Sequence, residues 1–182
     1  MASVRDKIDF NVDYFALFGL VPSFRTEGWD LDKRFQEIQA QIHPDKFVQS
    51  GESERRLSLQ WATRVNEAYQ ALKSPLCRAQ YLLDLMGQSI DKENNTRMPP
   101  EFLMEQMEWR EMAAEARQAQ KYDELEQLHH RVRQRANKNY EQLAELLDDK
   151  RDYVMAADRV RRLMFLEKLL VEIDESLAEL EG

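Results

Sequence analysis

Apolar residues recur at helical spacing through most of this chain, and no stretch alternates apolar and polar residues as a half-buried strand does. Within residues 30–42, one stripe with spacings of four, three and four contains Leu31, Phe35, Ile38 and Ile42. From residue 52 onwards, a second stripe contains Leu57, Trp61, Val65, Ala68, Tyr69 and Leu72. This pattern predicts an all-α protein.

Glycine and proline divide the first half of the chain into short helices. The apolar segment DYFALFGL, residues 13–20, is expected to form a short turn of helix that closes at Gly19. Asp30 is a plausible N-cap for the helix that follows. Pro44 ends that helix, because the residue before a proline disfavours the α conformation.

Residues 43–51 lie between the second and third helices and are expected to form a loop. The helical pattern resumes at Glu52, and Ser74-Pro75 separates that helix from another short one in residues 75–87. The first part of the chain is therefore predicted to contain four helices, of which the middle two form a hairpin.

Charge divides the chain in two. Residues 1–90 contain 11 lysines and arginines and 12 acidic residues, whereas the remainder contains 15 and 22, so the net charge of −8 is almost entirely in the second half. Between the halves, the segment GQSIDKENNTRMPP is polar, begins with glycine and ends with proline, as linkers do. We expect a first domain in residues 1–87, a linker in 88–99 and a second domain in 100–182.

Three long helices are expected in the second domain. Residues 99–119, 122–147 and 152–180 each carry helical periodicity. Pro100 suits the first turn of a helix, where a backbone N–H is not needed. Because short connections favour antiparallel neighbours, the second domain is predicted to be a three-helix bundle.

The composition argues against several classes of function. The single cysteine, Cys77, is expected to pack as a small apolar residue, because it has no second cysteine for a disulfide or thiolate metal site. His129 and His130 are adjacent in a predicted helix and point about 100° apart, which makes a poor metal pair. No apolar run approaches the roughly 18 residues of a membrane span, and the acidic net charge argues against nucleic-acid binding. We therefore expect no cofactor, metal, nucleic acid or membrane partner, and a cytoplasmic setting.

Two different stripes occupy the helix predicted in residues 99–119. One stripe contains Phe102, Trp109, Ala113 and Ala116. The other lies on nearly the opposite side and contains Leu103, Met104, Met107, Glu108 and Glu111. One helix of a three-helix bundle needs only one core stripe, so the second stripe is either a partner surface or is buried against the first domain or a dimer mate.

Phe165 presents the same choice on the last helix. The core face of that helix is expected to contain Leu163, Leu166, Leu170, Ile173 and Leu177. Phe165 points roughly 140° away from the centre of this face. It can join the second stripe of the first bundle helix only if the first and last helices of the bundle are neighbours.

The tripeptide His43-Pro44-Asp45 lies in the expected hairpin loop. Pro44 fixes its own φ, so His43 and Asp45 would project as preformed polar groups that suit docking on another protein. The alternatives are a helix-stop turn with a capping aspartate, and a catalytic site with His43 as general base. Base catalysis requires a nucleophile or substrate within reach and an orienting partner, and the sequence carries no G-x-S-x-G motif or phosphate-binding glycine loop. Docking is the favoured interpretation.

Residues 12–87 resemble the J domain of the DnaJ-type co-chaperones. The resemblance rests on DYFALFGL at the start, HPDK in the hairpin loop, and RVNEAYQALKSPLCRAQYL at the third helix and its exit. It implies that His43, Pro44 and Asp45 contact a DnaK-type chaperone and stimulate its ATPase, so that the protein activates a partner enzyme without being one. The basic residues available for that contact are Lys33, Arg34 and Lys46. So weak a basic face indicates lower affinity or a dedicated chaperone.

The second domain is similar to that of the HscB family, the J-domain co-chaperones of iron–sulfur cluster biogenesis. This resemblance rests on EFLMEQMEWRE and on AADRVRRLMFLEKL. It implies that the bundle binds the cluster scaffold protein IscU and presents it to the chaperone HscA. The implied scaffold-binding positions are Leu103, Met104, Met107, Glu108, Glu111 and Phe165. A J protein with a different client is the alternative that the sequence leaves open.

Overall fold

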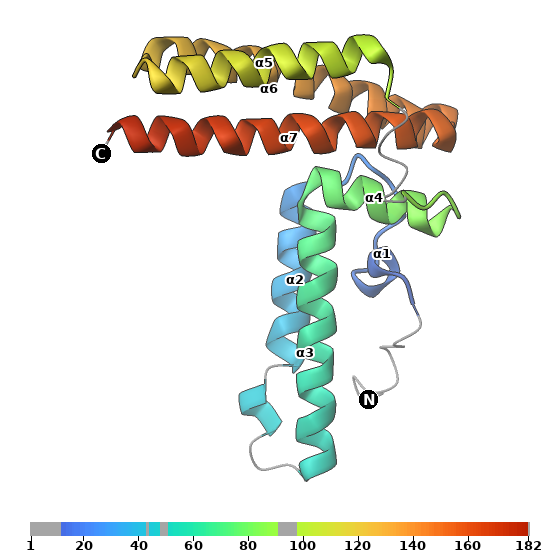
Figure 1. Cartoon of the computed structure of the whole chain (residues 1–182). Coiled ribbons are helices and arrows are strands. Elements are labelled where there is room, and N and C mark those ends of the chain that lie inside the picture. The colour runs from blue at the N-terminus through green and yellow to red at the C-terminus, as the bar shows by residue number, and fades with distance from the viewer. Residues whose placement is uncertain (1–11, 43, 48–50, 91–97, 182) are drawn as a thin grey trace. The chain divides into compact units, whose positions relative to one another are not determined.

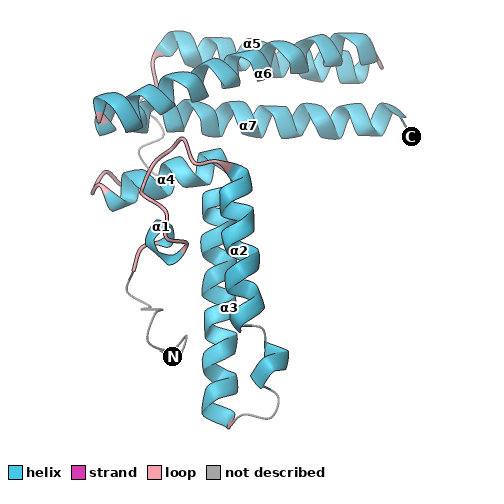
Figure 2. Cartoon of the chain, turned by 180° about the vertical axis from the view of Figure 1, so that it is seen from behind, coloured by secondary structure: helices cyan, strands magenta, loops and turns pink. Residues whose placement is uncertain are grey.

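The computed structural model describes residues 12–42, 44–47, 51–90 and 98–181 (Figure 1). Every regular element in those ranges is helical, as Figure 2 shows, so the prediction of an all-α fold is confirmed. The chain divides into two compact units, Met1–Leu82 and Leu83–Gly182. Among the described helices, none is both long and apolar enough to cross a membrane.

A helical hairpin forms the centre of the first unit (Figure 1). The helices of this part of the chain are α1 (Tyr14–Leu17), α2 (Gly28–Ile42), the short 3-10 turn η2 (Pro44–Phe47), α3 (Glu52–Lys73) and α4 (Pro75–Leu85), the last of which runs across the boundary between the two units. Helix α2 packs along α3, and α1 packs on α3 as well. The four predicted helices and the hairpin are therefore present.

The core of the hairpin contains most of the predicted apolar stripes, but some stripe residues are only half-buried. On α2, Leu31 and Ile42 are buried. On α3, the buried apolar side chains are Trp61, Val65, Ala68 and Leu72. Phe35 and Tyr69 are only half-buried, and their rings stack at a centroid distance of 4.0 Å. A partly exposed aromatic pair therefore links α2 to α3 at the border of their interface.

A polar cluster extends this edge of the hairpin. The Asp32 carboxylate of α2 accepts hydrogen bonds from Lys73 Nζ at 2.8 Å and from Tyr69 Oη at 2.8 Å, both on α3. The hydrogen bond from Lys73, followed by that from Tyr69, lowers the pKa of Asp32 below its usual value. The cluster joins the two helices near the start of α2.

Two expectations for the first unit need correction. Asp30 lies inside the first turn of α2 rather than at its N-cap, because the helix begins two residues earlier, at Gly28. There its carboxylate accepts a hydrogen bond from Arg34 Nε at 3.0 Å instead of capping the helix. Cys77 is exposed rather than packed, because it lies on the outer side of α4.

The second unit is a three-helix bundle, as predicted. It contains α5 (Pro100–Gln118), α6 (Tyr122–Ala144), the π-helical turn η4 (Glu145–Lys150) and α7 (Tyr153–Glu181). Helices α6 and α7 form the most extensive pair, and α5 packs against both of them. The fully buried core includes Leu125, Leu128, Leu143, Leu163, Leu166, Leu169, Leu170 and Ile173.

The bundle departs from the expected pattern at two places. Helix α6 ends at Ala144 and continues as η4, whose C-cap residue Arg151 is left-handed with φ 53°, so the helix does not run regularly to Leu147. On α7, Leu177 is half-buried and the unpredicted Leu169 is fully buried. Because α7 packs against both α5 and α6, its buried face is wider than one stripe.

Candidate protein-docking surfaces

The outer face of α5 carries an apolar stripe that the bundle leaves open. The exposed fractions are 38% for Leu103, 62% for Met104 and 71% for Met107. Glu108 and Glu111 beside them are exposed too. We call these five residues the α5 stripe. All five were predicted to lie off the core face of the helix, and their exposure confirms that placement.

The opposite face of α5 packs into the bundle. Phe102 and Ala116 are buried, while Trp109 and Ala113 are half-buried. Sequence reasoning missed Gln106, a polar residue that is as buried as Phe102. The core face of α5 is therefore made by residues other than those of the α5 stripe.

Phe165 lies on α7 and contacts α5 through Phe102, a residue of the core face. It is half-buried, because its ring packs edge-on against Phe102 with centroids 6.3 Å apart. The expectation that Phe165 faces water is therefore only partly met. The contact ties Phe165 to α5 at the residue that precedes Leu103 in the sequence.

Arg162 contacts the face of the Phe102 ring. Its guanidinium carbon lies 5.4 Å from the centroid of the Phe102 ring. Its Nε donates a hydrogen bond to Asp158 at 3.0 Å, one turn earlier on α7. The pair is thus held by a cation over the face of one ring and by the edge of the other.

A shallow groove of about 600 Å³ runs beside the α5 stripe. It is lined by Pro99, Glu101, Phe102, Met104, Glu105, Glu108, Arg135 and Arg162. Both arginines that line it are paired, Arg135 Nη2 with Glu105 Oε2 at 3.2 Å and Arg162 with Asp158 at 3.0 Å. Its lining combines apolar, acidic and basic side chains.

Two ion pairs link α5 to α7 on the C-terminal side of Met107. Arg110 Nε lies 3.6 Å from Glu172 Oε2, and Arg117 Nη2 lies 2.6 Å from Glu179 Oε2. All four side chains are substantially exposed. An apolar centre with a charged border is the usual anatomy of a protein-binding surface.

The second candidate surface is the hairpin tip of the first unit. His43 lies outside the described residues, and of Pro44 and Asp45 only the backbone is described, within η2. Lys46, in the same turn, is exposed. The turn follows directly after α2, in the hairpin position that the sequence predicted.

The two basic residues predicted on α2 differ in their surroundings. Lys33 is exposed. Arg34 is held inside the unit, because Nη1 donates hydrogen bonds to the backbone oxygens of Phe18 at 3.0 Å and of Gly19 at 3.3 Å. Together with the contact to Asp30, these bonds tie the end of α1 to α2. Docking through Arg34 would compete with this structural role.

The remaining polar groups offer little for catalysis. His129 pairs with Asp174 at 3.1 Å and His130 lies 2.8 Å from Gln134, both on the surface of the bundle. Among the described residues, no three histidine, cysteine or acidic side chains are placed to hold a metal ion. Fold and surfaces together define an all-helical protein with a helical hairpin in one unit and an exposed apolar surface on the other, a combination that suits a protein-docking role rather than catalysis.

Comparison with known proteins places this arrangement in one family. The family model described as "HSCB C-terminal oligomerisation domain" matches residues 98–174. A "Co-chaperone protein HscB homolog" from Azoarcus sp. is 52% identical over 175 residues, which cover 96% of this chain and 99% of that protein.

Solved structures agree with the sequence comparison. "Chaperone HscB from Vibrio cholerae" superposes with a TM-score of 0.84 at 36% identity, covering 93% of this chain and 99% of that one. Human co-chaperone protein HscB gives a TM-score of 0.87 at 28% identity, covering 92% and 83%. The chain belongs to the HscB co-chaperone family of iron–sulfur cluster assembly. It is a co-chaperone rather than an enzyme, and acts with a DnaK-type chaperone and a scaffold partner, as the family does.

Proposed function

We propose that this chain delivers the iron–sulfur scaffold protein IscU to the chaperone HscA in the cytoplasm and stimulates the HscA ATPase. The observation that carries the proposal is the α5 stripe, an apolar surface that the bundle leaves open although its core is complete. Exposed apolar surfaces with charged borders mark partner sites in soluble proteins. Membership of the HscB family supports the choice of partners.

The scaffold-binding surface comprises the α5 stripe and Phe165. Its apolar members would supply most of the binding energy, because a few central side chains dominate most protein interfaces. Glu108 and Glu111 lie at the border, where charge mainly sets association rate and specificity. The packing of Phe165 against Phe102 restricts its ring before the partner arrives, which lowers the ordering cost of binding.

The chaperone-binding surface comprises His43, Pro44 and Asp45, with Lys33, Arg34 and Lys46 nearby in the sequence. We assign residues 1–87 to a J domain, residues 88–99 to a linker and residues 100–182 to the scaffold-binding domain. In this arrangement the two partners bind to different domains, so that scaffold and chaperone can be held by the same molecule.

Calorimetric titration of IscU tests the scaffold surface. Replacing Leu103, Met104 and Phe165 by alanine should weaken binding by about 2 kcal/mol or more in total. The melting temperature should fall only slightly, because none of the three side chains is fully buried. The matched control replaces Val154 and Val171, two exposed apolar residues of α7 outside the surface, and should bind as wild type does.

Unchanged affinity in the triple variant would show that IscU, if it binds, does so elsewhere. A collapsed melting transition in the triple variant, with the control intact, would show that the three residues belong to the core.

A further inference from the structure

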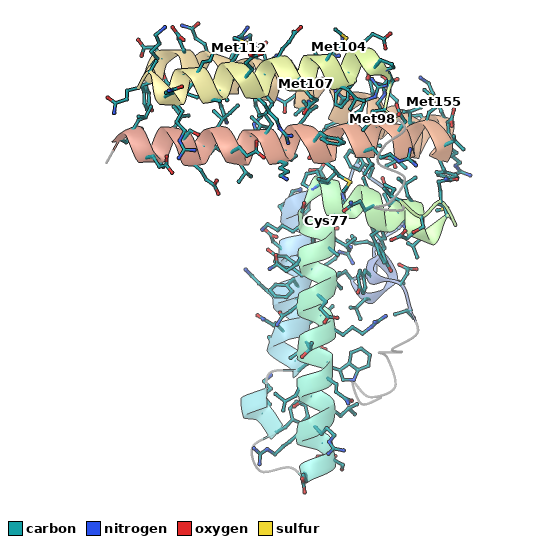
Figure 3. All side chains as sticks on the ribbon, in the orientation of Figure 1. Cys77, Met98, Met104, Met107, Met112 and Met155 are labelled. Atoms are coloured by element: carbon teal, nitrogen blue, oxygen red, sulfur yellow. The ribbon has the colours of Figure 1, made fainter. Side chains whose placement is uncertain are left out.

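Two methionines, Met104 and Met107, lie on the α5 stripe. Figure 3 shows Met104, Met107 and Met112 projecting from α5, with Met155 on α7. Met104 and Met107 have the largest exposed fractions of the described methionines, 62% and 71%. Met98, just before α5, is 6% exposed and serves as an internal reference.

From this distribution we infer that Met104 and Met107 are an oxidation site, at which peroxide converts the thioethers to sulfoxides and thereby releases the scaffold partner. The inference rests on the proposed function, because it requires the α5 stripe to be the scaffold-binding surface. It makes delivery by this co-chaperone sensitive to the same oxidants that damage exposed iron–sulfur clusters.

The chemistry is a two-electron oxygen transfer. A sulfur lone pair attacks one oxygen of hydrogen peroxide, the O–O bond breaks, and a sulfur–oxygen bond forms. The thioether is oxidised to a sulfoxide and the peroxide is reduced to water, with the proton moving to the departing oxygen. The product is reversible by methionine sulfoxide reductases, which makes it suitable as a switch.

Exposure determines which sulfurs react. Peroxide must reach the lone pair, so the exposed Met104 and Met107 should react ahead of the buried Met98. Met112 and Met155 are also exposed, at 40% and 44%, and lie outside the proposed scaffold surface. They should react as well without affecting binding, and therefore form a control pair within the same chain.

A sulfoxide on the α5 stripe changes the surface but not the bundle. The added S=O group is strongly polar, whereas the stripe binds by excluding water from apolar side chains. The fold should be retained, because both side chains point away from the core face held by Phe102 and Ala116. Loss of binding would therefore come from the surface alone.

The experiment compares scaffold binding before and after oxidation in the full chain. Wild type, Met104→Leu/Met107→Leu and Met112→Leu/Met155→Leu are treated with hydrogen peroxide and then with dithiothreitol, which reverses thiol oxidation at Cys77 to disulfide or sulfenate but not methionine oxidation. Peptide mass spectrometry locates the sulfoxides, and calorimetry gives the ratio of IscU affinities before and after treatment.

The expected result is about a tenfold or greater loss of affinity in oxidised wild type and in the Met112/Met155 variant. The Met104/Met107 variant should show a ratio near one, whatever its starting affinity. Treatment of oxidised wild type with sulfoxide reductases should restore binding. The inference is overturned if Met104 and Met107 oxidise no faster than Met98, or if oxidised wild type binds as before.

A separate measurement isolates failure of the proposed function. Met107→Asp is titrated without oxidation, because a charge at that position should weaken binding if the stripe is the scaffold surface. Unchanged affinity would contradict the proposed scaffold site itself. Weakened binding, together with insensitivity to peroxide, would overturn only the oxidation switch.

Discussion

Trp61 is the largest buried side chain on α3, a helix that packs against both α1 and α2. Its replacement by alanine would leave a cavity in the hairpin, and such cavities cost about 3–5 kcal/mol. We expect Trp61→Ala to melt the first unit at a much lower temperature, because domains of this size have only about 5–15 kcal/mol of stability. Leu59, which lies two residues earlier on the exposed side of the same helix, is the matched control. Equal melting of Trp61→Ala and Leu59→Ala would contradict the assigned core face.

Lys33 and Arg34 are adjacent, basic and predicted to act differently. Arg34→Ala removes hydrogen bonds to the oxygens of Phe18 and Gly19 and should cost about 1–2 kcal/mol, because the donor is charged but half-exposed. Lys33→Ala should leave stability within about 0.5 kcal/mol of wild type and reduce only chaperone affinity. Urea unfolding, paired with a titration of chaperone ATPase stimulation, separates the two roles. Equal unfolding midpoints would show that Arg34 does not tie α1 to α2.

For single residues, the sequence predicted burial better than it predicted hydrogen-bond partners. Helical spacing placed Trp61 on the core face and Met107 off it, because both depend only on periodicity. It treated Arg34 as a free cation, since its partners are backbone oxygens 15 and 16 residues away. The prediction that Cys77 packs in the core was wrong, because composition does not show which side of a short helix faces solvent.

Helix α5 packs in the bundle through a narrow buried face, and one residue of that face is polar. Gln106 is buried, and neither atom of its side-chain amide has a hydrogen-bond partner among the described residues. An unsatisfied buried amide costs about 1–3 kcal/mol. Gln106→Leu should therefore stabilise the second unit by about 1 kcal/mol or more, which corresponds to a rise of roughly 4–8 °C in its melting temperature.

Gln118→Leu is the control for this change, because Gln118 is exposed on the same helix and leucine and glutamine have similar helix propensities. It should leave the melting temperature unchanged. Scaffold affinity should be unaffected by Gln106→Leu, since the residue faces away from the α5 stripe. A lower melting temperature for Gln106→Leu would mean that the amide is satisfied in solution.

The sequence predicted which helices form better than it predicted the residues at which they begin and end. All the predicted helices are present, but α2 begins two residues earlier than expected and α6 ends in a π-helical turn. Both ends are set by local backbone hydrogen bonds, such as that from the Asp30 N–H to the Glu27 oxygen, which periodicity does not contain. The half-burial of Phe165 likewise required knowledge that α5 and α7 are neighbours.

The whole molecule has two compact units, and we propose that each has one task. The hairpin unit would act on the chaperone through its tip, and the bundle would hold the scaffold through the α5 stripe and Phe165. Each surface can be removed by substitutions that leave the other unit's core intact. A single assay can therefore test both surfaces in the same molecule.

That assay is the steady-state ATPase rate of HscA, measured with and without IscU in the presence of three forms of this chain. Wild type should stimulate the chaperone alone and stimulate it further when scaffold is added. His43→Gln should abolish stimulation under both conditions. The Leu103, Met104 and Phe165 triple-alanine variant should retain the scaffold-independent stimulation and lose the increment from IscU. Stimulation that survives His43→Gln, or a triple-alanine variant that loses the scaffold-independent part, would contradict the account.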